Sequence, residues 1–93
     1  MNKVITKEKL DKCRSLTAKA LEIAKNSVLK RKKKEAKEII EMVENYLSDS
    51  KYFEKNKDFI SAFAALNYAH GWLDSGARLG IFQVSDNRLF TIK

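Results

Sequence analysis

The most apolar part of the chain is residues 58–80, where hydrophobic positions recur at the three- and four-residue steps of an α-helix. Two such rows interleave: Phe59, Phe63, Leu66, His70, Leu73, Ala77 and Gly80 form the first, and Ala62, Ala65, Ala69, Trp72, Gly76 and Leu79 form the second. Together they cover roughly 200° of the helix circumference, wider than the stripe of an ordinary surface helix. We therefore expect a helix that contacts two neighbours at once. Asp58 is suited to cap its start, and Gly80 is suited to end it.

Two further amphipathic helices are predicted upstream, over about residues 6–28 and 33–54. Thr6 can cap the first, and the turn between them falls near residues 27–32. One long helix through that turn is the alternative, but it would leave apolar faces unburied in a monomer. The polar turn at residues 55–57, in which Asn56 can take the left-handed conformation, is short enough to make the second and third helices antiparallel neighbours. Residues 1–93 are thus expected to form one all-α domain, an up-down-up three-helix bundle.

The character of the chain changes after Gly80. Phe82 and Val84 alternate with polar residues, as do Phe90 and Ile92, and a turn sequence at residues 85–87 separates the two pairs. Residues 81–93 are therefore expected to form a short extended segment or a β-hairpin that packs on the helices, because an isolated hairpin is marginal in water.

The remaining face of the third helix carries a polar stripe that we consider a candidate binding surface: Asn67, Gly71, Asp74 and Arg78, with His70 beside it. A glycine in mid-helix costs about 1 kcal/mol relative to alanine, so Gly71 calls for a reason. Close approach of another backbone or of a ligand would supply one. The simpler interpretation of Asp74 and Arg78 is an intrahelical ion pair, and that of His70 is a partly buried side chain hydrogen-bonded across helices.

The formal net charge of +7 is concentrated in the first third of the chain. Residues 1–34 hold twelve Lys or Arg against three acids, which gives +9, whereas residues 35–93 hold seven against nine, which gives −2. A basic run is responsible for much of this: Lys30, Arg31, Lys32, Lys33 and Lys34. Such a run attracts phosphate-rich or acidic partners. A solvated turn between helices is the more economical interpretation.

The sequence offers little for catalysis. It has no glycine-rich phosphate loop, no second histidine for a zinc site and a single cysteine, Cys13, which is expected to pack as a small hydrophobe. A Cys13–His70 dyad would need an exposed, activated thiol. Ribonuclease domains of prokaryotic toxins, which are also small helical bundles, carry an arginine four to six residues before a histidine. Here the positions four to six before His70 are Leu66, Ala65 and Ala64, so that activity is not supported. No metal or cofactor is expected, and the balance is against an enzyme. With no signal-peptide pattern and no apolar run of membrane-spanning length, the chain is expected to be cytoplasmic.

Residues 52–82 carry a specific pattern that includes the string NYAHGWLDSGARLG. The pattern resembles an archaeal family of small helical proteins catalogued as domain of unknown function 357. The matching positions are Tyr52, Phe53, Asp58, Ala62, Phe63, Asn67, Tyr68, Ala69, His70, Gly71, Leu73, Asp74, Gly76, Arg78, Leu79 and Gly80, and residues 89–92 resemble the family's ending. The resemblance is weakest over residues 1–35. It implies a three-helix domain and no assigned activity.

Two functions fit these features. The favoured one is a helical interaction module that docks a protein partner, or its own copy, on the polar stripe or in a groove of the bundle. The alternative is a nucleic-acid-associated protein that binds phosphates through the basic run, with an affinity that falls steeply as salt rises.

Overall fold

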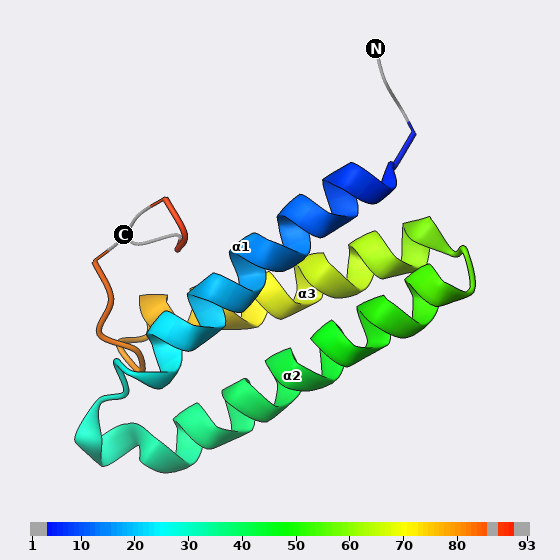
Figure 1. Ribbon diagram of the computed structural model, residues 1–93. Helices are drawn as coiled ribbons and strands as arrows, with labels where there is room; N and C mark the ends of the chain where they lie inside the picture. The colour runs from blue at the N-terminus through cyan, green and yellow to red at the C-terminus, as the bar shows by residue number, and fades with distance from the viewer. Residues whose placement is uncertain (1–3, 86–87, 91–93) are drawn as a thin grey trace.

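The computed structural model describes residues 4–85 and 88–90. It contains three α-helices, α1 (Lys7–Lys25), α2 (Lys33–Lys55) and α3 (Phe59–Arg78), and a single 3-10 turn, η1 (Lys30–Lys32), ahead of α2. The helices run up, down and up, and α3 lies between α1 and α2 in the view of Figure 1. The predicted all-α three-helix bundle is confirmed. The first helix ends three residues earlier than predicted, where Asn26 caps it.

The helix starts follow from capping groups that the sequence displays. The Thr6 hydroxyl accepts the backbone N–H of Lys9 at 3.1 Å, and the Asp58 carboxylate accepts that of Ser61 at 3.1 Å. Each bond satisfies one of the donors left unpaired at a helix start. Helix α2 has no such cap, because Lys32 precedes it and makes no side-chain capping bond.

The turns differ in one detail from the prediction. Gly80 ends α3 in the left-handed region, with φ +77°, as expected. In the turn between α2 and α3, however, Lys57 rather than Asn56 is left-handed, with φ 62°. Asn56 instead caps the end of α2 with a φ of −89°, and its side chain donates to the carbonyl of Tyr52 at 3.0 Å. The turn still makes α2 and α3 antiparallel neighbours.

Helix α3 is the centre of the core, as its two apolar rows predicted. One buried cluster joins Ala69 and Leu73 of α3 to α1 and α2, and a second joins Ala62 and Leu66 to Leu10 of α1. The small residues of the second row, including Ala65 and Gly76, are buried. Leu79 departs from the prediction: it lies past the last buried turn and is exposed.

The chain after α3 returns to the turn between α1 and α2. The N–H of Leu29 donates to the carbonyl of Ile81 at 2.9 Å, and the N–H of Gln83 donates to that of Ser27 at 2.7 Å. This is an antiparallel bridge between Val28 and Phe82. No strand forms within residues 81–85 or 88–90. The tail therefore begins as a non-helical segment; the turn residues of the predicted hairpin, Asp86 and Asn87, and residues 91–93 lie outside the described residues.

Candidate functional site

The polar stripe predicted on α3 lies on the surface of the bundle. Asn67, Gly71 and Arg78 are exposed, and Asp74 is half-buried. Exposed apolar side chains lie on the same side of the helix: Ile60 is 76% exposed, Tyr68 63% and Leu79 74%. We call this surface the α3 outer face and define it as Ile60, Ala64, Asn67, Tyr68, Gly71, Asp74, Ser75, Arg78 and Leu79. These residues share one side of the helix because they recur at helical spacing.

The glycine at the centre of the α3 outer face has no packing partner among the residues that the structure describes. A Cβ atom on Gly71 would have no atom outside its own helix turn within 4 Å. The close approach made within the chain belongs to Gly76, where a Cβ would lie 2.5 Å from the ring of Phe82. The two glycines therefore differ: Gly76 is required by the core, and Gly71 leaves a smooth, open position on the surface.

His70 is turned from this face toward α1 and the C-terminal segment. Its Nδ1 lies 3.3 Å from the Thr17 hydroxyl, and its Nε2 lies 2.7 Å from the carbonyl oxygen of Leu89. Since a carbonyl only accepts, Nε2 carries a proton and donates to Leu89, while Nδ1 and the Thr17 hydroxyl form the second hydrogen bond. The predicted hydrogen bond across helices is thus present. It holds the tail against the bundle.

A small cavity of about 210 Å³ brings Cys13 and His70 to the same wall, together with Asn67 and Arg88. Both ring nitrogens of His70 are already engaged, so the imidazole has no nitrogen left to accept a thiol proton. The Cys13–His70 dyad considered from the sequence therefore has its residues near one another but lacks an available base.

Asp74 also differs from the prediction. Within the described residues, Oδ1 of Asp74 lies 3.8 Å from Nε2 of His70, and Arg78 is not within ion-pair distance of Asp74. The separation of four residues is the same, but the partner is on the opposite side in sequence. Tyr68 of the same helix stacks on Tyr46 of α2 with ring centroids 5.5 Å apart. The aromatic pair fixes one edge of the α3 outer face against α2.

The basic run forms the turn that leads into α2. Lys30 to Lys32 make the 3-10 turn η1, and Lys33 and Lys34 are the first residues of α2. Four of the five are exposed and Lys32 is half-buried. In the described part of the chain only Lys32 lies within ion-pair distance of a carboxylate, 3.9 Å from Glu35. The positive end of an uncapped helix thus adds to five cations.

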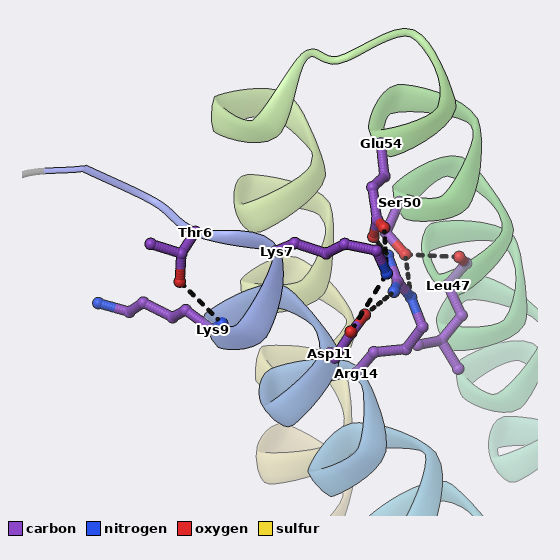
Figure 2. Close-up of polar contacts among 8 residues, drawn as sticks. All are labelled: Thr6, Lys7, Lys9, Asp11, Arg14, Leu47, Ser50 and Glu54. Atoms are coloured by element: carbon purple, nitrogen blue, oxygen red, sulfur yellow. Dashed lines mark hydrogen bonds and ion pairs between the residues drawn. The ribbon is translucent and has the colours of Figure 1, made fainter.

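A polar cluster between α1 and α2 was not anticipated from the sequence. Arg14 of α1 reaches across to Glu54 of α2, with Nη2 2.8 Å from Oε1, and its Nε donates to the Ser50 hydroxyl at 3.3 Å. The Arg14 and Glu54 side chains are each 17% exposed. Figure 2 shows Lys7 and Asp11 joining the same cluster. One sign of the cluster could have been found in the sequence: Ser50 places a hydroxyl on the buried side of α2, where a polar partner is needed.

This cluster and the Lys25–Glu44 pair, at 2.9 Å, join α1 to α2 at two separate places. Contact with Glu44 also raises the pKa of Lys25, and the hydrogen bond to Asp11 raises that of Lys7. These ties are structural. In the described ranges, 4–85 and 88–90, no three side chains of the metal-binding types gather into a cage, and no helix has the length and hydropathy to cross a membrane.

The fold and its surfaces thus define a small helical domain whose exposed features are an apolar-polar helix face and a cationic turn. The family model for proteins of unknown function, DUF357, matches residues 6–82. The chain therefore belongs to the DUF357 family, as its central string suggested. Residues 89–92 lie beyond the matched range. Neither the curated proteins nor the solved structures contain a match to the chain.

Proposed function

We propose that this chain is a non-catalytic interaction module that docks a helix of a partner, or of a second copy of itself, on the α3 outer face. The observation that supports it most is Gly71. An exposed glycine in mid-helix costs about 1 kcal/mol relative to alanine, and no neighbour among residues 4–85 and 88–90 occupies the space it leaves. A docked helix would use that space for close backbone approach.

The surroundings of Gly71 support the same role. Ile60, Tyr68 and Leu79 expose apolar surface on that face, while Ala64 and Ser75 have small side chains that leave the backbone around Gly71 accessible. A helix with small residues between larger apolar ones allows a second helix to approach closely and to bury the larger side chains at its flanks. Asn67 and Arg78 supply polar groups at the edge. The cytoplasmic location predicted from the sequence is part of this proposal.

The test is a comparison of wild type with Gly71→Lys, which places a long charged side chain where the partner would lie. Ser48→Lys, at an exposed position of α2, adds the same charge elsewhere and is the control. Sedimentation of the purified proteins reports self-association, and affinity capture from the source organism's lysate reports partners. We expect association by wild type and by the control, and its loss in Gly71→Lys. A monomer whose captured proteins are the same for all three variants would contradict the proposal.

The alternative function is binding of nucleic-acid phosphates by Lys30, Arg31, Lys32, Lys33 and Lys34. It is favoured by the exposure of these side chains at the uncapped start of α2. Gel shifts with mixed RNA and with duplex DNA at low and moderate salt test it. Binding should weaken steeply with salt and be lost when Lys32, Lys33 and Lys34 are changed to Glu. Absence of binding by wild type at low salt removes this function.

A further inference from the structure

A second surface, separate from the α3 outer face, lies between the end of α1 and the first half of α2. It is an open groove of about 490 Å³. Its apolar lining is Val28, Ala36 and Ile40, of which Val28 and Ile40 are only partly buried although they pack against the core. Three lysines, Lys25, Lys33 and Lys37, surround this lining. The groove therefore combines an apolar floor with a cationic rim.

The acids that also line the groove do not cancel its charge. Glu44 pairs with Lys25 at 2.9 Å, so these two charges offset each other. Among the other lining residues, the positive charges of Lys33 and Lys37 exceed the single negative charge of Glu41. The remaining cations of the basic run, Lys30 to Lys32 and Lys34, continue from the same end. Helix α2 also starts there without a capping side chain, so its positive end adds to the potential. A ligand that fits this groove must be both anionic and apolar.

These two requirements discriminate between classes of partner. A nucleic-acid backbone satisfies the cations but has no continuous apolar ridge to cover Val28, Ala36 and Ile40. An amphipathic helix with one apolar stripe and acidic flanks satisfies both. The groove follows α2 from Lys33 to Glu44, twelve residues, or about 18 Å at 1.5 Å per residue. That length accommodates about three turns of a bound helix.

We propose that this groove binds an acidic amphipathic helix of a partner protein, with the apolar stripe of that helix on Ile40 and its neighbours and its carboxylates on Lys33 and Lys37. The site is independent of the α3 outer face and shares no residue with it. It gives part of the basic run a specific role, since Lys33 belongs both to the run and to the rim of the groove.

The probe is a fluorescein-labelled synthetic peptide of about 14 residues, four helical turns, with Leu at helical spacing and Glu on the flanks. A scrambled peptide of the same composition and a version with Lys in place of Glu are the ligand controls. The protein variant is Lys33→Glu with Lys37→Glu. Its control is Lys12→Glu with Lys19→Glu, which makes the same charge change on exposed positions of α1. Fluorescence anisotropy gives the affinities.

We expect the acidic amphipathic peptide to bind wild type, and the scrambled and Lys-containing peptides not to bind. The Lys33, Lys37 reversal should weaken binding at least about tenfold, and the Lys12, Lys19 reversal by less than about threefold, because long-range charge is screened while contact pairs are not. Ile40→Ala should also weaken binding, with thermal unfolding as a check on its fold. Gly71→Lys should leave binding unchanged, which separates this site from the α3 outer face.

Four results would overturn the proposal. Equal binding of the scrambled peptide, or equal weakening by both charge reversals, would show attraction to net charge without a groove. Failure of the peptide to bind, together with RNA or DNA binding that the Lys33, Lys37 reversal abolishes, would assign the cations to nucleic acid. Failure of the peptide together with self-association lost in the same variant would make a second copy the occupant.

Discussion

The ring of Phe82 occupies the space that a side chain on Gly76 would need. Its Cε2 and Cδ2 atoms lie 2.5 and 2.6 Å from the position of a Cβ on that residue, and Cδ1 of Ile39 in α2 lies 3.3 Å from the same position. Phe82 is 1% exposed, so the ring has no open space into which it could move. The absence of a side chain at residue 76 is what lets the chain fold back over the end of the bundle.

Gly76→Ala should therefore lower the free energy of unfolding, by about 1–3 kcal/mol as for other overpacked cores. Gly71→Ala is the matched control. There the added methyl meets none of the residues that the structure describes, so the higher helix propensity of alanine should raise stability by up to about 1 kcal/mol. Urea unfolding of both variants gives the comparison. A shift of the same sign at the two glycines would show that the Phe82 contact does not limit residue 76.

Arg14→Met should destabilise the bundle by about 2 kcal/mol, because it leaves the carboxylate of Glu54 largely buried without its closest partner. Lys25→Met removes the same charge from the exposed pair with Glu44 and should have a much smaller effect, since exposed ion pairs contribute little. Thermal unfolding of the two variants reports the difference. Equal losses would mean that burial adds nothing to the Arg14 pair.

Thr17→Val should destabilise the protein by about 1 kcal/mol, because Nδ1 of His70 would lose its hydrogen-bond partner at a position where Thr17 is 3% exposed. Thr17→Ser keeps the hydroxyl and should retain most of the stability. The ¹⁵N spectrum of His70 should show the tautomer protonated at Nε2, which donates to Leu89. The Nδ1–H tautomer would contradict the arrangement described here.

Titration of Asp58 should make the free energy of unfolding depend on pH within one narrow acidic range. The side-chain and backbone hydrogen bonds of Ser61 lower the pKa of Asp58 from 3.8. The folded chain then holds fewer protons than the unfolded chain between that lowered pKa and 3.8, so stability rises with pH across this interval. The contribution is complete above pH 3.8 and is lost as pH falls through the folded pKa.

Asp58→Asn, which cannot titrate, isolates this effect from the other carboxyl groups. The stability difference between wild type and Asp58→Asn should be constant at neutral pH and should shrink as the pH falls below 3.8. Urea unfolding at a series of pH values measures it. A difference that stays constant down to pH 2 would show that the cap does not depend on the charge of the carboxylate.

The sequence predicted those features that are decided locally. The bounds of α3 follow from Asp58 and Gly80, whose capping and left-handed geometry need only neighbouring backbone groups. From the width of the apolar arc on α3 we correctly predicted that this helix packs against two neighbours, which are α1 and α2. The lack of a strong stop signal after residue 25 explains why the end of the first helix was predicted too late: the helix ends at Asn26, whose side chain donates to the carbonyl of Glu22 at 3.0 Å.

Features that depend on distant residues could not be predicted in this way. Periodicity could not show which of the two mid-helix glycines meets a neighbour, because the answer depends on where Phe82 returns. It also could not show that Phe82 bridges to Val28, or that Arg14 faces Glu54. Asp74 has a charged residue four positions away on one side and a histidine four positions away on the other, and spacing alone does not choose between them.

The bridge between Val28 and Phe82 ties the tail to the turn that carries the basic run. Leu29, the residue before η1, is held by the carbonyl of Ile81. A fusion or truncation that disturbs residues 81–83 would therefore loosen the backbone that carries the basic run, residues 30–34, far upstream in the sequence. Affinity tags intended for binding work on this protein belong at its N-terminal end, because a tag that disturbed the tail would change the surface to be measured.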